Sequence, residues 1–228
     1  MTKKLIIFGA AEIASLAKFY FMHDSNYDVV AFTVDDQYVE ADCFDGLPVV
    51  PFSEMGVKYP SQEFDMHVAL SYQKFNQLRE EKYFQAKKAG YHLATYVSTK
   101  ATTWPDLCVG DNCFILEDQT IQPTVKIGNN VMLWSGNHIG HGTVIGDHTY
   151  LASHVVISGH CQIGQRCFIG VNASFRDFLK VGDDVFVGMD SSVSKDLESG
   201  SMVLSAQSEF FDPGDRKAQR IKKIYFKS

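Results

Sequence analysis

The sequence lacks the features of a membrane, secreted or nucleic-acid-binding protein. Its five cysteines include no CxxC pair, so we interpret them as reduced side chains of a cytoplasmic protein. No apolar run approaches the roughly 18 residues of a membrane span, and the short run after Lys4 does not suffice for a signal peptide. The formal net charge of -6 argues against general nucleic-acid binding. A globular chain, 45% apolar and 21% charged, is the class that remains.

An apolar residue recurs at every sixth position between residues 109 and 193. A period of six fits neither an amphipathic helix nor a half-buried strand, whose periods are 3.6 and 2. It is typical of a parallel β-helix, in which three hexapeptides form one triangular coil. We therefore predict a prism over residues 98–197 with these side chains inside. They are Val109, Ile115, Ile121, Ile127, Leu133, Ile139, Ile145, Leu151, Ile157, Ile163, Ile169, Phe175, Val181, Val187 and Val193.

Glycine often follows the apolar position of the repeat. We expect these glycines to relax the backbone at the corners of the prism, where a positive φ is required. They are Gly110, Gly128, Gly140, Gly146, Gly164, Gly170, Gly182 and Gly188.

Residues 1–97 have the pattern of a small α/β domain. We expect strands over 4–8, 27–34, 64–70 and 91–97, and helices after the first strand and over 75–89. The first three elements form a βαβ unit. The tail, 198–228, carries six Lys and Arg residues, and it predicts either a basic helix over the open end of the prism or a solvated charge run.

Two short segments lie where a βαβ unit binds ligands. Gly9-Ala10-Ala11 joins the first strand to the helix, and Asp35-Asp36 ends the second strand. One glycine where a dinucleotide site needs three disfavours NAD. The turn either presents backbone N–H groups to a phosphate or is simply tight at its glycine, and the sequence leaves both interpretations open.

Five of the eight histidines lie between residues 138 and 160, in turn or outward positions of the repeat. His148, His154 and His160 are spaced by six residues, so they fall on different sides of a triangular prism and do not converge on one metal ion. For His148 and His154 we favour a turn position generated by the repeat. His141 differs, because it opens the segment His-Gly-Thr-Val-Ile-Gly-Asp.

Several motifs resemble the family of sialic acid O-acetyltransferases and bacillosamine-type amino-sugar N-acetyltransferases. They are a βαβ unit before the prism, Ile-x-His-x-x-x-Ile-Gly-Asp at 139–147, Phe-Thr-Val-Asp-Asp at 32–36, Ile-Ser-Gly-His-Cys-Gln-Ile-Gly at 157–164 and Cys-Phe-Ile-Gly-Val-Asn-Ala at 167–173. The resemblance covers nearly the whole chain. It implies an N-terminal Rossmann-like domain followed by a left-handed parallel β-helix, and three prisms packed as a homotrimer.

The resemblance also implies an activity, the transfer of an acetyl group from acetyl-CoA to a sugar, with the amine of a nucleotide-linked amino-deoxy sugar as the favoured acceptor. His141 is then the general base and the Gly159 N–H faces the acetyl carbonyl. No metal takes part. The other residues implied at the cofactor are Val171, Met189, Tyr150 and His160. Those expected at the sugar or its nucleotide are Gly9, Ala10, Ala11, Asp35, Asp36, Ser71, Tyr72, Trp134 and Asn137.

The chain departs from the family pattern in one place that concerns the base. The family often has an acidic residue directly after the histidine, and Gly142 stands there, so the partner that orients His141 is not identified. Three other functions are alternatives: O-acetylation of a sugar hydroxyl, a hexapeptide metalloenzyme of the carbonic-anhydrase type, and a sugar-nucleotide binder without catalysis.

Overall fold

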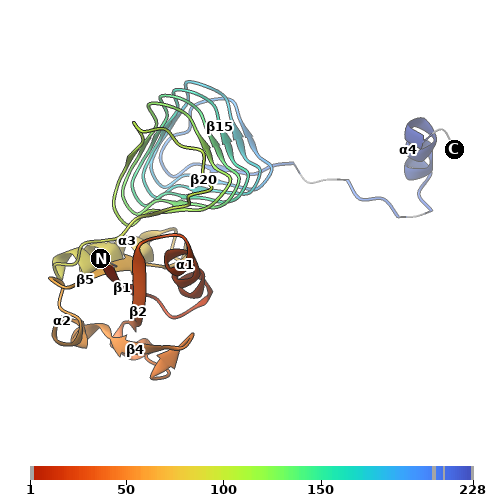
Figure 1. The fold of residues 1–228 in the computed structure, drawn as a ribbon. Helices are drawn as coiled ribbons and strands as arrows, with labels where there is room; N and C mark the ends of the chain where they lie inside the picture. The colour runs from red at the N-terminus through yellow and green to blue at the C-terminus, as the bar shows by residue number, and fades with distance from the viewer. Residues whose placement is uncertain (1–2, 207–208, 213, 227–228) are drawn as a thin grey trace.

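The computed structural model describes residues 3–206, 209–212 and 214–226. They form an α/β domain, a three-sided prism of short parallel strands, and a terminal helix that stands away from both (Figure 1). In the part of the chain that is described, no helix has the length and apolar character needed to cross a bilayer.

The α/β domain is built on a five-stranded sheet in the order β3-β4-β2-β1-β5, parallel except between β3 and β4. Its central strands are apolar and buried on both faces, as parallel strands covered by helices are. The elements are β1 (Lys3–Phe8), α1 (Glu12–His23), β2 (Tyr27–Val34), η1 (Asp36–Tyr38), β3 (Cys43–Phe44), β4 (Leu47–Pro51), η2 (Phe52–Glu54), α2 (Met55–Lys58), β5 (Phe64–Val68) and α3 (Gln77–Lys88). The expected βαβ order is confirmed.

The segment 91–97 differs from the expected strand. Leu93 makes one parallel bridge with Met66, and the chain then leaves the domain. Only β6 (Tyr96–Val97) is a strand, and it pairs with the prism strand β8. Residues 96–97 therefore pair with the prism and not with the sheet of the α/β domain. The local sequence does not show this long-range pairing.

The prism has three parallel sheets, named here after their first strands in the repeat. The β7 sheet is β7-β10-β13-β16-β19, the β8 sheet is β6-β8-β11-β14-β17-β20-β22, and the β9 sheet is β9-β12-β15-β18-β21. Paired residues such as Met132 and Tyr150 are one coil, 18 residues, apart. The side chains predicted to point inward form one core, in which all from Ile115 to Val193 are buried.

Each prism strand has two residues, with sharp turns between. The strands are β7 (Cys108–Val109), β8 (Phe114–Ile115), β9 (Thr120–Ile121), β10 (Lys126–Ile127), β11 (Met132–Leu133), β12 (His138–Ile139), β13 (Val144–Ile145), β14 (Tyr150–Leu151), β15 (Val156–Ile157), β16 (Gln162–Ile163), β17 (Phe168–Ile169), β18 (Ser174–Phe175), β19 (Lys180–Val181), β20 (Phe186–Val187), β21 (Ser192–Val193) and β22 (Met202–Val203).

The expectation for the repeat glycines is wrong. None of the eight has a positive φ; a Cβ there would instead lie within about 3 Å of the next coil, as at Gly164, where backbone is 2.5 Å away. Positive φ occurs two residues later, at every sixth residue from Asn112 to Asp190. That slot holds mostly Asn, Asp, His and Gly, which tolerate the left-handed region. His148 and His154 occupy it, which confirms their interpretation as turn residues.

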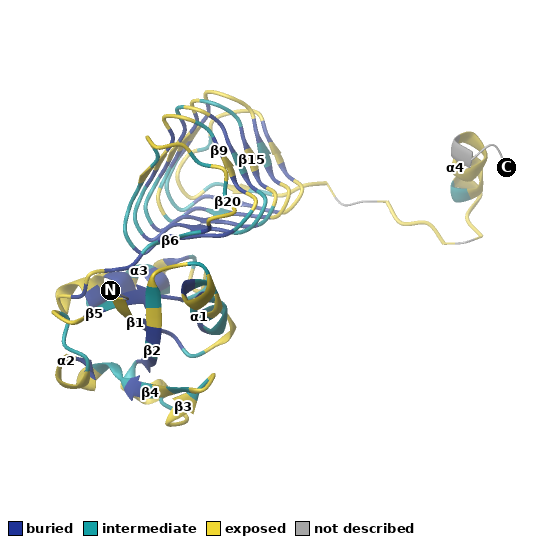
Figure 2. Ribbon diagram, in the orientation of Figure 1, coloured by how far each residue is buried: buried dark blue, intermediate teal, exposed yellow. Residues whose placement is uncertain are grey.

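The α/β domain packs on the β8 sheet, whose strands are buried on that side (Figure 2). Phe114, Met132 and Tyr150 point outward from the sheet into a shared core with α1 and the domain sheet. On α3, the buried Arg79 donates hydrogen bonds to the carbonyls of Asn130 and His148. The domain and the prism therefore share a continuous core.

The terminal helix α4 (Arg216–Phe226) is basic, as expected, with five Lys and Arg residues. It does not cover the end of the prism but stands apart from the coils (Figure 1). Lys227, also part of the predicted basic tail, lies outside the described residues.

Candidate functional site

His141 lies where the chain turns from the β9 sheet to the β7 sheet, a corner of the prism that we call the His141 corner. The side chain is exposed, and its ring makes an edge contact with His160 at 4.8 Å between centroids. His160 in turn stacks on Phe178, with centroids 4.9 Å apart. The prism therefore brings His141 and His160 together, as two of the predicted site residues.

The partner that orients His141 is Gln122, one coil below. Its Oε1 accepts a hydrogen bond from the backbone N–H of His141 at 2.8 Å and lies 2.9 Å from Nδ1 of the ring. The sequence analysis missed this residue. A coil of 18 residues puts positions 122 and 123 directly beneath 140 and 141, so the repeat length contained the signal.

Gly159 lies directly above His141. A Cβ on Gly159 would be 2.9 Å from Cε1 and 3.1 Å from Nε2 of the histidine, so the ring rests on the glycine backbone. Among the described residues, none accepts a hydrogen bond from the Gly159 N–H. An unpaired amide beside an imidazole is the arrangement that acyl transfer uses to stabilise a developing oxyanion.

Gly142 explains the missing acidic residue. Its φ is +68°, and a Cβ there would lie 2.5 Å from Nδ1 of His160. No larger residue fits beside His141 unless His160 moves.

Two strained residues flank the histidines in the same column of the His141 corner. Thr124 and Phe178 have φ values of 66° and 60°, although a β-branched or bulky side chain rarely adopts this region. Thr124 Oγ1 accepts a hydrogen bond from the Gly142 N–H, which holds the turn after His141. Backbone strain of this kind clusters at functional sites.

Val171 and Met189 lie at a different corner, between the β8 and β9 sheets. They stack in neighbouring coils, are both exposed, and Asp190 donates a backbone hydrogen bond to Val171 at 2.8 Å. A single chain does not bring them to His141.

Tyr150, one of the residues implied at the cofactor, is buried in this chain. It lies under the α/β domain, stacked on Phe168 at 5.3 Å, and burial raises its pKa to about 12. Trp134 packs beside it in the same interface. Asn137 is buried too, and its side chain bonds the backbone of Trp134 and Val155, so it holds a turn. The six-residue period predicts that a side chain points outward from the prism. It does not show which of the three sheets is covered by the α/β domain.

A cavity of about 600 Å³ opens in the α/β domain at the carboxyl ends of β1 and β2. Gly9, Ala10, Ala11 and Asp35 line it, so the two segments predicted to meet do so. α1 begins at the cavity, and its N-cap residue Ala11 provides no side-chain cap, which leaves backbone N–H groups for an anion. Gly9 itself is required by a φ of +129° and by the Ala69 carbonyl, 2.8 Å from where its Cβ would lie.

Other predicted residues lie outside this cavity. Asp36 accepts a hydrogen bond from the Ser53 N–H, and neither Ser71 nor Tyr72 lines the cavity. The Tyr72 ring packs on Tyr150 and Phe168 at the domain interface. Leu70 and Gln73, on either side of the pair, line the cavity instead.

Lys82 is a cavity residue that the sequence analysis missed. Burial disfavours its charge, but the carboxylates of Asp35 and Glu81, each 2.9 Å away, raise its pKa. It is therefore a fixed cation beside Asp35. It lies in a helix with other lysines, so nothing in the sequence distinguishes it as a cavity residue. In the described part of the chain, no three His, Cys, Asp or Glu side chains are placed to hold a metal ion.

Part of the prism matches a known class of repeat. The model of the bacterial transferase hexapeptide family (six repeats) matches residues 124–159, the coils that contain His141 and Gly159. No curated protein matches the chain.

Several solved structures are similar to this chain over nearly its whole length. The acetyltransferase domain of PglB from Neisseria gonorrhoeae matches with a TM-score of 0.78 and 20% identity over 88% of this chain and 95% of that one. PerB from Caulobacter crescentus, solved with CoA and GDP-perosamine, gives 0.78 and 21% over 89% and 94%. WeeI from Acinetobacter baumannii gives 0.75 and 21% over 90% and 97%. The predicted fold, a Rossmann-like domain followed by a left-handed β-helix, is confirmed.

Proposed function

We propose that the protein transfers an acetyl group from acetyl-CoA to a sugar, with the amine of a nucleotide-linked amino-deoxy sugar as the favoured acceptor. One observation carries the proposal: an exposed, hydrogen-bonded His141 rests on the backbone of Gly159, whose N–H is unpaired among the described residues. A base and an oxyanion donor are thus adjacent on a fold shared with sugar acetyltransferases.

The chemistry needs both groups at once. Acetyl-CoA supplies the acetyl group as a thioester. His141 Nε2 takes a proton from the acceptor amine as its nitrogen attacks the thioester carbonyl carbon, and the Gly159 N–H stabilises the negative charge on the carbonyl oxygen. As the C–N bond forms and the C–S bond breaks, the CoA sulfur leaves as a thiolate. No covalent acyl-enzyme is involved.

The cavity of the α/β domain supports a nucleotide-linked acceptor. The uncapped start of α1 suits a phosphate, and apolar side chains such as Phe8, Val34 and Phe44 suit the flat faces of a base. PerB, of the same fold, was solved with GDP-perosamine. We assign Gly9, Ala10, Ala11 and Asp35 to the nucleotide on this basis.

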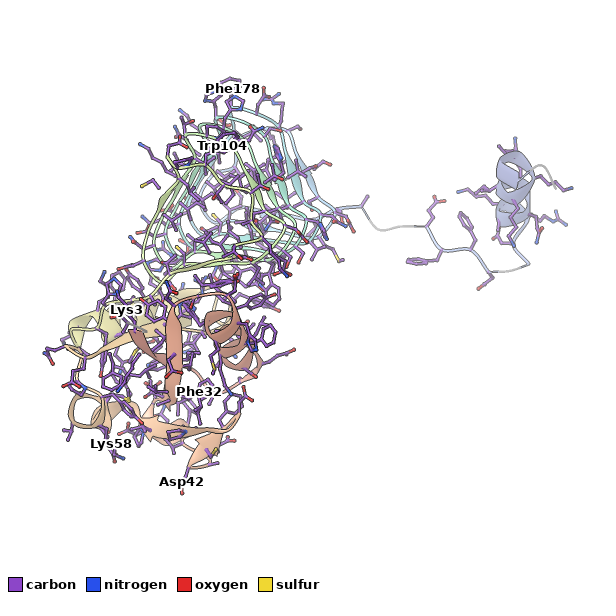
Figure 3. The ribbon with its side chains drawn as sticks, viewed as in Figure 1. Lys3, Phe32, Asp42, Lys58, Trp104 and Phe178 are labelled. Atoms are coloured by element: carbon purple, nitrogen blue, oxygen red, sulfur yellow. The ribbon has the colours of Figure 1, made fainter. Side chains whose placement is uncertain are left out.

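The proposed reaction requires more than one chain. The α/β domain covers the β8 sheet, whereas Phe178, which marks the His141 corner, lies at the far side of the prism (Figure 3). A sugar held in the cavity therefore meets the base of a neighbouring copy, as in the homotrimer that the resemblance implies. The same packing brings Val171 and Met189 of one copy toward CoA bound at the His141 corner of another.

The test compares His141→Asn with His154→Asn. His154 is also an exposed prism histidine, but it lies at the corner of Val171, in a left-handed slot that asparagine tolerates. We expect His141→Asn to lower kcat/KM by about 10²–10⁴-fold, with the melting temperature and CoA affinity retained. The assay uses acetyl-CoA with a panel of nucleotide-linked amino sugars and their hydroxyl analogues. Near-native turnover by His141→Asn refutes the assignment, and so does an equal loss in His154→Asn with CoA affinity retained.

A further inference from the structure

We propose that Gln122 is the positioning residue of the base: it fixes His141 as the Nδ1–H tautomer and so leaves Nε2 free to accept the substrate proton. This rests on the proposed function. Gln122 lies 19 residues before His141 in the chain, one coil below it, and its backbone N–H bonds the carbonyl of Ile139 in the coil above. This hydrogen bond fixes the backbone of Gln122, from which the side chain extends to His141.

The hydrogen-bond pattern determines the tautomer. A backbone N–H is only a donor, and the His141 N–H points to the terminal atom of Gln122 that lies 2.8 Å away, so this atom must be the amide oxygen. The same oxygen lies 2.9 Å from His141 Nδ1. Since a carbonyl oxygen only accepts, Nδ1 must carry the proton. In the neutral ring the other nitrogen, Nε2, is then unprotonated and is the basic atom.

The neighbours of the ring favour this division of roles. The ring packs on Gly159: a Cβ there would lie 2.9 Å from Cε1, 3.1 Å from Nε2 and 3.3 Å from Nδ1, and of the two ring nitrogens only Nδ1 is bonded to Gln122. Two ionisable groups belong to the surroundings: His160, in edge contact with the ring, and Asp106, whose carboxylate is bonded to the Thr124 N–H. The backbone N–H of His160 bonds the His141 carbonyl, but among the described residues neither side chain forms a hydrogen bond with the His141 ring. The neutral amide of Gln122 is therefore the partner that sets the tautomer.

This arrangement replaces the acidic residue that follows the histidine in related sequences. A side chain at position 142 would meet the His160 ring, since a Cβ there would lie 2.5 Å from its Nδ1. A neutral amide orients the imidazole as a carboxylate does, but it adds no stabilisation to the imidazolium formed on proton transfer. A carboxylate at position 122 must therefore shift the pH dependence of kcat. If residue 122 had only a structural role, replacing its amide by a carboxylate would leave that pH dependence unchanged.

The experiment compares Gln122→Met, Gln122→Glu and the control Gln165→Met, which changes an exposed glutamine at another corner. Nitrogen-15 NMR of the imidazole, assigned by the signal lost in His141→Asn, reports the tautomer without any substrate. We expect the Nδ1–H form in the native protein and in Gln165→Met, and a mixture of tautomers in Gln122→Met. With turnover, Gln122→Met should lower kcat about 10-fold or more with KM little changed. Gln122→Glu should restore kcat and move the acidic limb of its pH profile up by about one unit.

The outcomes separate the two proposals. An Nε2–H tautomer in the native protein, or a tautomer and kcat unchanged in Gln122→Met, overturns the role of Gln122. So does a pH profile that Gln122→Glu leaves unmoved. If the tautomer changes as expected but no acceptor is acetylated, Gln122 still positions His141 and it is the proposed function that fails.

Discussion

At the scale of single residues, glycines of the prism are required for different reasons. Gly140 and Gly159 both lie at the His141 corner, but a methyl group on Gly140 would meet the backbone N of Gly159 at 2.5 Å, whereas one on Gly159 would meet the His141 ring. Backbone in a stacked coil does not yield, while a surface ring can rotate. The alanine substitutions at Gly159 and Gly140 should therefore differ in whether they lower kcat or the melting temperature.

We expect Gly159→Ala to keep the melting temperature and to lower kcat, because the His141 ring is displaced from the amide that stabilises the oxyanion. Gly140→Ala should instead lower the melting temperature, since the coils must separate. Thermal melts and steady-state kinetics of both variants are the measurement. A Gly159→Ala protein with native kcat would show that the ring does not act from this position.

Acidic residues at the domain interface make stability depend on pH. Asp24 ends α1 and accepts hydrogen bonds from the Thr99 hydroxyl at 2.5 Å, the Tyr96 hydroxyl at 2.7 Å and the Thr99 N–H at 2.9 Å. These bonds lower the pKa of Asp24 to about 2. Because the folded pKa lies below the unfolded value, the ionised carboxylate stabilises the fold above about pH 4, and this contribution is lost as the pH falls toward 2.

We expect Asp24→Asn to lower the melting temperature at pH 7 and to have progressively less effect between pH 4 and pH 2. The control is Asp28→Asn, which alters an exposed carboxylate of β2 without a side-chain partner among the described residues. Melts across this pH range measure the difference. If the melting temperature of Asp24→Asn stayed below that of the native protein at pH 2, the Asp24 side chain would stabilise the fold through packing and not through its charge.

At the scale of elements, α3 is attached to the prism by a buried charge. Arg79 is almost fully buried, and its guanidinium bonds the Asn130 and His148 carbonyls and the Asn76 side chain. Among the described residues it forms no ion pair with a carboxylate. Burial lowers its pKa to about 10, so it remains charged at neutral pH. Carbonyl groups at the turn of a coil thus find their donors on another domain.

Removing the Arg79 side chain should weaken the attachment of α3 to the prism. We expect Arg79→Met to cost about 2–4 kcal/mol, because buried carbonyls lose their donors. Lys88→Met, on the exposed side of the same helix, should cost little. Chemical denaturation gives the free energy, and hydrogen exchange in α3 should rise in the first variant alone. Equal stability of the two variants would contradict the role of the charge.

The elements also show what the sequence could predict. A period of six identified the prism and its inward side chains, because each coil repeats one local conformation. Tyr150 could not be placed, since its outward slot is equivalent to that of Val144 and only the docked domain buries it. Lys82 acts through a partner distant in the chain, Asp35. The contacts of His141 with Gln122 and with Gly159, by contrast, follow from the 18-residue coil.

At the scale of the whole molecule, the two halves of the proposed site lie on opposite sides of one chain. The cavity belongs to the domain on the β8 sheet, and His141 to the corner that Phe178 marks on the far side of the prism (Figure 3). If neighbouring copies supply the halves, two inactive variants should complement each other. One is His141→Asn, which lacks the base, and the other is Ala10→Phe, which fills the cavity.

Each variant alone should form trimers without activity, because every site then lacks one half. When the two are unfolded together and refolded at equal concentration, about a quarter of the sites should combine an intact His141 with an intact cavity, and that share of the native activity should return. Mass spectrometry confirms that the trimers are mixed, and the variants refolded separately and then combined are the control. Mixed trimers that remain inactive would mean that base and acceptor meet within one chain, and activity in Ala10→Phe alone would exclude the cavity as the acceptor site.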